Sequence, residues 1–592
     1  MGQEAQEEAS LAPKHLPSVG ADLDGAFGAK EPLRGAGGRR HRSNLLGLVA
    51  WLALVLVLVL ISPFLLPASA SASELDAAEA IRVADRDPKV VELRAGPGEL
   101  GSDAAEVDGR WEVSYFDEGE RVGLVVVDSE SGAVRESWTG YQVDWRMARG
   151  YEGAFGHALN APYVFLPLCA LFLLGLVDWR RPWRVANLDL VVLLAFGASH
   201  LFFNRAEIGV SVPLQYPVLL YLLGRSLWIG LRGGEGIRPV WPATWLLVAA
   251  LFLVGLRVGL DVADSGVIDV GYASVVGADR IADGEALYGE FPADVARGDT
   301  YGPANYLAYV PFEAVWPWSG EWDDLPAAHA AAIAFDLATL VLLYLLGLRI
   351  RPGPAGRKLA ATLAFAWAAY PYTAYVLESN SNDTLVAMLL AATLLFLTRP
   401  IARGAFMAMA VLTKFAPLVL APMLLNASPV GGAVGGTAPE DASATGRGGG
   451  SPAATGPAGR ALCAFIVVAA VVLAWPALDP GPATLWDRTI AYQAGRDSPF
   501  SIWGQVPSLE PLRLAILAAA GALSVLFAFR PRRKTLTQVA ALGAALLIGL
   551  QLTAEHWFYL YVVWFFPLLL VAMATPEPAS SRARSSRPAR AR

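Results

Sequence analysis

Six aspartates lie between residues 261 and 294, in a polar segment that follows a long apolar run. A carboxylate held about 3 Å from a hydroxyl can remove its proton while the oxygen attacks an electrophilic carbon. The spacing alone does not single out one of the six. A solvated acidic loop, or a carboxylate that caps a helix, explains the same residues without any chemistry.

Further polar residues occur where other apolar runs end. The segment LESNSND carries Asn382, FMAMAVLTKFAPLVLAPMLL carries Lys414, GRDSPFSIWGQ carries Arg496, and AEHWFYLYVVW carries His556. Carboxylates, amides and cations around one cleft suit a hydroxyl nucleophile and a phosphate leaving group. The alternatives are a lysine that reaches toward lipid headgroups and boundary residues that are merely hydrogen-bonded.

The composition indicates which elements must position these residues. The chain is 55% hydrophobic and 17% charged, whereas an average soluble protein has about 45–50% and about 25%. Its apolar residues form runs near the ~20 residues that a helix needs to cross a bilayer. We therefore expect an all-α polytopic membrane protein and no soluble fold.

The charge pattern predicts the topology of these runs. The terminal segments 1–44 and 576–592 lack any helical or strand period, so both are expected to be disordered tails. Both are basic near the apolar runs, which predicts that both lie in the cytoplasm. Two termini on the same side require an even number of crossings. Residues 303–318 and 403–425 fit as re-entrant segments, and a miscounted span is the alternative. The twelve predicted crossings are 46–66, 161–177, 187–203, 213–231, 240–260, 328–349, 358–377, 384–398, 460–477, 511–529, 535–551 and 556–574.

Two segments between the tails have their own character. Residues 45–67 are too long and too far from Met1 for an ordinary signal peptide, so we interpret them as an uncleaved signal anchor, with a cleaved signal as the alternative. Residues 427–459 are rich in Gly, Ala, Ser and Pro and predict a flexible cytoplasmic insertion.

Residues 73–150 are the one stretch with soluble-domain patterning. A segment with helical spacing precedes GRWEVSYF, VVVDSESGAV and WTGYQV, which alternate apolar and polar residues like strands. The order predicts a helix followed by an antiparallel meander. These motifs resemble the PepSY-type extracytoplasmic module, which implies a small α+β regulatory or binding domain. A non-homologous sheet is the alternative.

The motifs of residues 240–575, taken in order, carry a second resemblance. VIDVGYASVVGADRIADGEALYG, YGPANYLAYVPFEAVWPW, ESNSND and GRDSPFSIWGQ, with the segment around Lys414, resemble polyprenyl-phosphate-sugar-dependent membrane glycosyltransferases of the C-type superfamily. The likeness is to actinobacterial α-mannosyltransferase-like proteins. This chain departs from them by its helices in 161–239, its outer domain, its insertion 427–459 and YGPANYL in place of a YPPL-like segment.

The resemblance implies roles for individual residues. An acid in the first outer loop acts as general base in such families, and this position falls on Asp269, with Asp264 and Asp279 as alternatives. A cation in a low-dielectric cleft would stabilise the departing phosphate, and Lys414 suits that role. The predicted substrate-binding residues are Lys414, Arg496, His556, Asp279 and Asn382.

The expected activity is transfer of a mannose-like hexose or a pentose from a polyprenyl-phosphate donor to a hydroxyl of a lipid, glycan or protein. The reaction would take place on the outer face of the plasma membrane, without a metal or other cofactor. Nucleic acid is not an expected partner. A transporter or lipid flippase and a non-catalytic scaffold or sensor are the alternatives, although we find no inverted repeat and the ionisable residues gather at one interface.

Overall fold

The computed structural model describes residues 75–574, except 97, 108, 151–154, 323–324, 428–455 and 496–497. Both predicted tails, the predicted signal anchor 45–67, most of the insertion 427–459 and the candidate residue Arg496 lie outside the described residues.

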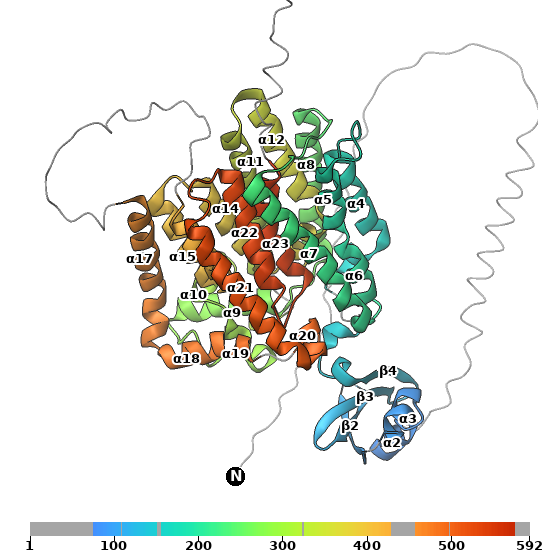
Figure 1. Ribbon diagram of the computed structural model, residues 1–592. Helices are drawn as coiled ribbons and strands as arrows, with labels where there is room; N and C mark the ends of the chain where they lie inside the picture. The colour runs from blue at the N-terminus through green and yellow to red at the C-terminus, as the bar shows by residue number, and fades with distance from the viewer. Residues whose placement is uncertain are drawn as a thin grey trace, which may run out of the picture. The chain divides into compact units, whose positions relative to one another are not determined.

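The described chain begins with a small sheet domain. Asp76 caps the first helix, since its side chain accepts a hydrogen bond from the backbone N–H of Glu79 at 2.7 Å. Four antiparallel strands follow in the spatial order β1-β2-β3-β4, and both helices lie beside them (Figure 1). The predicted order of helix and then meander is confirmed. The elements are α2 (Ala77–Ala84), α3 (Pro88–Arg94), β1 (Gly101–Val107), β2 (Arg110–Asp117), β3 (Glu120–Asp128) and β4 (Val134–Thr139).

The sheet domain has its core on the face that the helices cover. Tyr115 and Val125 from the central strands are fully buried against Ala80 and Ala84 of α2. The alternation of the strands places these side chains on one face, because successive residues of a strand point to opposite sides. The domain joins the next part of the chain through the side chain of Gln142, which donates to the carbonyl of Ala206 at 3.1 Å.

The rest of the described chain is helical, with short turns of 3-10 or π-helix between the main elements. These helices are α4 (Pro162–Leu176), α5 (Val185–Leu194), α6 (Phe196–Phe203), α7 (Ile208–Arg232), α8 (Ala243–Asp264), α9 (Asp269–Asp283), α10 (Pro303–Glu313), α11 (Pro326–Ile350), α12 (Gly353–Ala369), α13 (Pro371–Glu378), α14 (Asp383–Leu395), α15 (Pro400–Thr413), α16 (Ala421–Leu425), α17 (Pro457–Leu478), α18 (Pro482–Trp486), α19 (Tyr492–Ala494), α20 (Ile502–Gln505), α21 (Glu510–Phe529), α22 (Leu536–Gln551) and α23 (Val562–Ala572).

Five helical segments among the described residues are long and apolar enough to cross a membrane. This finding is consistent with a membrane protein, but it does not support the predicted count of twelve crossings. Several predicted spans are shorter as helices: α14 has 13 residues, or about 20 Å, against the ~30 Å of hydrocarbon in a bilayer. The five segments are Val185–Phe203, Ala243–Asp264, Pro326–Ile350, Pro457–Leu478 and Pro507–Phe529.

Residues 400–427 form a hairpin whose two ends meet. Helix α15 stops before Lys414, and the chain returns through the 3-10 helix η8 (Ala416–Leu420) and α16. The guanidinium of Arg403 donates to the carbonyls of Leu425 and Ala427 at 3.0 and 2.6 Å, which fixes the start of the hairpin beside its end. Segment 403–425 thus folds back on itself, as a re-entrant segment requires, and Lys414 lies at the tip.

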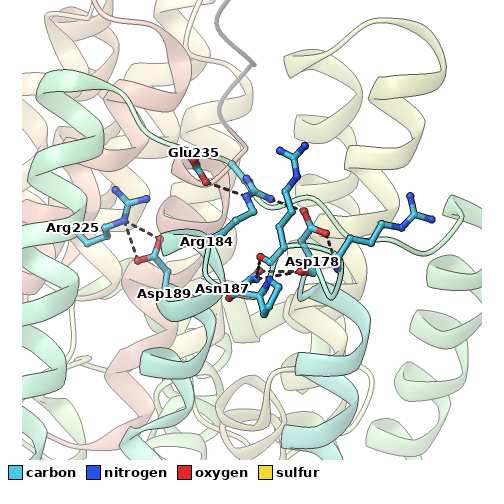
Figure 2. Close-up of polar contacts among 10 residues, drawn as sticks. Asp178, Arg184, Asn187, Asp189, Arg225 and Glu235 are labelled. Carbon is cyan, nitrogen blue, oxygen red and sulfur yellow. Dashed lines mark hydrogen bonds and ion pairs between the residues drawn. The ribbon is translucent and has the colours of Figure 1, made fainter. Parts of the chain in front are cut away.

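The end of the helical part opposite Lys414 is held by ion pairs between loops (Figure 2). Arg184 lies 3.3 Å from Asp178 and 3.0 Å from Glu235, and Arg225 of α7 lies 2.9 Å from Asp189 of α5. These contacts tie the loop before α5 to the segment that follows α7, and they tie α5 to α7. Arg184, which lies between the predicted crossings 161–177 and 187–203, is therefore partly neutralised by carboxylates.

Candidate functional site

Lys414 lies in a buried ion pair at the tip of the hairpin. Its ammonium is 2.5 Å from Oδ1 of Asp383, and the two residues are only 9% and 0% exposed. The Asp383 carboxylate also accepts hydrogen bonds from the indole N–H of Trp564 at 2.7 Å and from the hydroxyl of Ser381. Three donors from separate segments thus stabilise one buried negative charge, as a carboxylate in a low-dielectric setting requires.

The side chain of Lys414 lines a cavity of about 350 Å³. The ammonium lies 5.3 Å from the ring centroid of Tyr301, 5.5 Å from that of Tyr561 and 5.3 Å from that of Trp564. These distances permit cation–π attraction. An aromatic wall with few polar groups is typical of a pocket for an amphiphilic ligand. The other lining residues are Thr300, Phe415, Ala416, Ile490, Gln493 and Ala494.

A close backbone approach fixes one wall of this cavity. The N–H of Gly302 donates to the carbonyl of Thr413 at 3.2 Å, so the start of α10 lies against the tip of the hairpin. A side chain at position 302 would collide with the carbonyl of Leu412. Glycine is therefore required here for space, and it places Tyr301 beside Lys414.

Asp269 begins α9 and is exposed. The residue before it, Ile268, donates its backbone N–H to the carbonyl of Ser379 at 3.3 Å, so the start of α9 adjoins the ESNSND segment. The Asp269 carboxylate lies close enough to the Lys414 ammonium to interact with it electrostatically. The structure therefore brings the predicted base and the predicted cation into one neighbourhood.

Asn382 lies beside this neighbourhood in a buried amide chain. Its Nδ2 donates to the side-chain oxygen of Asn305 at 2.8 Å, and the Asn305 amide donates to the Ser274 hydroxyl at 2.9 Å. These bonds link the segment before α14 to α10 and α9. Asn382 is fully buried, and its own amide oxygen has no hydrogen-bond partner among the described residues.

Two other predicted residues lie away from Lys414. Asp279 is ten residues after Asp269 on α9, about 15 Å along the helix axis, where burial and the nearby Asp283 and Glu285 raise the pKa of its carboxyl. His556 bonds the hydroxyl of Ser498 at 3.0 Å and packs against Trp145 and Phe500. The contacts of His556 thus lie among residues that do not line the Lys414 cavity.

Sequence reasoning did not pair Lys414 with Asp383. A lysine within an apolar hairpin needs a counter-ion, and LESNSND was the nearest polar segment on the same predicted side. That argument selects a carboxylate from Glu378 or Asp383 without any coordinates. The ion pair between Arg488 and Asp299, at 2.5 Å, was missed because two loops almost 200 residues apart give no local signal.

A second polar cluster adjoins the start of α9. His329 Nδ1 lies 3.3 Å from both the Asp261 carboxylate and the Ser265 hydroxyl, which also accepts a bond from the Asn380 amide. Glu378 is 1% exposed. Burial, followed by the charges of Asp261 and Asp264, raises the pKa of Glu378 to about 8.

These side chains provide proton donors and acceptors more readily than metal ligands. Within the parts of the chain that the structure describes, no three His, Cys, Asp or Glu side chains are arranged to hold a metal ion. Comparison with known proteins gives no further guide, because neither a protein family nor a curated protein matches this chain.

Proposed function

We propose that the chain is an integral membrane glycosyltransferase that moves a mannose-like hexose or a pentose from a polyprenyl-phosphate donor to an acceptor hydroxyl. The observation that carries the proposal is the cavity at Lys414, where an ammonium, three aromatic rings and the nearby Asp269 carboxylate come together. The resemblance of residues 240–575 to polyprenyl-phosphate-dependent enzymes supports the same assignment.

Asp269 is the proposed general base. Asp269 is exposed, so an acceptor hydroxyl can approach its carboxylate. As the acceptor oxygen bonds to the anomeric carbon, its proton passes to the carboxylate, and the bond between that carbon and the phosphate oxygen breaks. One displacement of this kind inverts the configuration at the anomeric carbon.

Lys414 is the proposed partner of the departing phosphate. An ammonium has three N–H donors, and the Asp383 carboxylate accepts a bond from Lys414 in the structure. The remaining donors can reach a phosphate oxygen in the cavity. Asp383 would then hold the lysine side chain in place, while the rings of Tyr301, Tyr561 and Trp564 contact apolar parts of the donor.

The membrane arrangement belongs to the same proposal. Both termini are assigned to the cytoplasm and the Lys414 cavity to the outer face, with about twelve crossings that include the short apolar helices. An outer site suits a lipid-linked donor, because soluble nucleotide sugars are confined to the cytoplasm. The sheet domain would then lie outside, as a binding or regulatory module.

The test is the transfer of radiolabelled sugar from polyprenyl-phosphate mannose or pentose in membranes that contain the full chain. Asp269→Asn should lower transfer about 10²–10⁴-fold, the usual contribution of a general base. Asp283→Asn is the matched control, an exposed carboxylate on the same helix, and it should transfer at the unsubstituted rate.

Two results would count against the proposal. Transfer by Asp269→Asn at the normal rate would remove Asp269 as the base. If the unsubstituted chain transfers sugar from neither donor, the enzyme assignment is wrong, and a transporter or a scaffold becomes the favoured interpretation.

A further inference from the structure

A second cavity, which is polar, lies at the end of the helical part opposite Lys414. It has a volume of about 360 Å³ and is lined by Asn426, Ala528, Phe529, Arg530, Arg532 and Lys534. Asn426 lies between the two hairpin residues whose carbonyls bond to Arg403, and its amide donates to the carbonyl of Ala528 at 2.9 Å. Helix α15, with 14 residues, separates this end from Lys414 by about 21 Å.

The cavity contains three cationic side chains that have no carboxylate partner among the residues that the structure describes. Lys534 is only 5% exposed, yet no described residue forms an ion pair or a side-chain hydrogen bond with its ammonium. Burial lowers the pKa of Lys534, and no neighbouring carboxylate offsets the effect. Arg530 and Arg532 likewise have no ion-pair partner among the described residues.

Two arginines labelled in Figure 2, Arg184 and Arg225, differ from these cations. Arg184 and Arg225 lie toward the same end, and each is within 3.3 Å of a carboxylate. The close approach of Gly230, near the end of α7, to Leu542 places that end beside the start of α22. These two arginines pair with carboxylates, whereas the three cations at the second cavity have no ion-pair partner among the described residues.

We propose that this second cavity binds a phosphate group, carried by an anionic lipid or by a small soluble phosphate ester. Arginine matches the geometry of phosphate oxygens with paired N–H donors, and a buried ammonium adds a compact charge. Basic pockets at the cytoplasmic ends of membrane helices are typical sites for anionic headgroups. The site is independent of the proposed transferase reaction.

The surroundings suit a lipid as the carrier of that phosphate. Phe529, next to the cationic residues, is 63% exposed, and Val525 and Leu526 continue this exposed apolar face along α21. Because α21 belongs to one of the five candidate spans, acyl chains could lie along this face while the headgroup occupies the cavity. A soluble ester would use the same cations without that apolar contact.

The test measures ligand binding to the full chain in two arms. One arm adds inorganic phosphate or pyrophosphate to protein in phosphatidylcholine nanodiscs, at ionic strength matched with chloride. The other compares nanodiscs of phosphatidylcholine with nanodiscs that also contain phosphatidylglycerol, and it counts bound lipids by native mass spectrometry. Thermal unfolding followed by tryptophan fluorescence is read in both arms.

The variants are Lys534→Gln and Arg532→Gln, with Arg533→Gln as the matched control. Arg533 is exposed in the same loop but does not line the cavity. Each cavity variant should weaken binding about tenfold to a hundredfold, the effect of one lost charge-assisted hydrogen bond. Arg533→Gln should bind like the unsubstituted chain. If Lys534→Gln does not fold, the comparison of Arg532→Gln with Arg533→Gln tests the proposal. The side chain of Arg532 is exposed, so its replacement should leave the fold intact.

Each outcome has a definite meaning. Binding in the soluble arm identifies a phosphate ester, and binding only in the phosphatidylglycerol arm identifies a lipid. The proposal is wrong if the unsubstituted chain prefers neither phosphate over chloride nor phosphatidylglycerol over phosphatidylcholine. It is also wrong if Arg533→Gln weakens binding as much as Arg532→Gln does, since general surface charge would then explain the effect.

Discussion

Replacing Lys414 with methionine should destabilise the fold strongly. The substitution keeps most of the side-chain volume but leaves the Asp383 carboxylate buried without its cation. Trp564 and Ser381 still donate to that carboxylate. Removal of one partner from a buried ion pair costs about 3–5 kcal/mol, because the remaining charge is uncompensated. We expect a loss in the free energy of unfolding within that range.

The double variant Asp383→Asn with Lys414→Met isolates the electrostatic part of this loss. It removes both charges, and the asparagine oxygen can still accept the bond from Trp564. Residues in one ion pair typically show coupling energies of about 0.5–3 kcal/mol. The double variant should therefore lose less stability than the sum of the two single variants by an amount in this range.

The assay is denaturant-induced unfolding of the reconstituted chain, followed by tryptophan fluorescence. Lys414→Arg is the control, since it retains a cation near Asp383. Two results would refute the reasoning: a Lys414→Met variant as stable as the unsubstituted chain, or a double variant whose loss equals the sum of both single losses. Either would mean that the ion pair does not stabilise the hairpin tip.

Two further predictions concern the neighbourhood of the cavity. The folded chain holds a proton on Glu378 up to about pH 8, because burial raises the pKa of this carboxyl. The unfolded chain releases the proton near the ordinary pKa of ~4.3. The free energy of unfolding should therefore fall as the pH rises between these two values, by up to about 1.4 kcal/mol per pH unit. Glu378→Gln should remove this slope in pH-dependent unfolding, and an unchanged slope would assign it to another group. Gly302→Ala should cost about 1–3 kcal/mol of stability by overpacking and should lower sugar transfer. Gly255→Ala, whose new methyl group meets open space, should cause neither effect, and equal losses in both alanine variants would exclude the close approach as the cause.

The sequence predicts local properties of this chain better than long-range ones. Apolar runs and the helix-then-meander order of residues 73–150 follow from composition and periodicity, which neighbouring residues determine. The return of segment 403–425 was also predictable, because Lys414 and Pro417 interrupt an apolar run. The predicted count of twelve crossings is not supported, since five helical segments among the described residues are long and apolar enough to cross a membrane.

The candidate site shows the same division. The roles proposed for Lys414 and Asp269 come from residue type and from the predicted side of the membrane, and the structure shows only that the two residues lie in one neighbourhood. The contact of Trp564 with Asp383 could not be predicted, because the two residues come from segments about 180 residues apart. Asp279 shows the effect of helix geometry: it shares α9 with Asp269, yet a separation of ten residues places it about 15 Å further along the axis.

The pairing of Lys414 with Asp383 leads to a last prediction, which rests on the proposed function. In the free protein the carboxylate balances the lysine charge, so a phosphate must share that cation. Asp383→Asn leaves the ammonium buried without a counter-ion, which should weaken the free fold and make an anionic ligand more stabilising. A ligand that binds only the folded state raises stability according to its concentration relative to Kd.

Polyprenyl phosphate should therefore raise the unfolding temperature of Asp383→Asn more than that of the unsubstituted chain, and it should have little effect on Lys414→Met. Dolichol or another polyprenol without the phosphate is the matched control for the apolar contacts alone. An equal increase in all three proteins would show that the ligand binds away from Lys414. An increase that the free polyprenol reproduces would show that the aromatic wall, and not the ammonium, recognises the lipid.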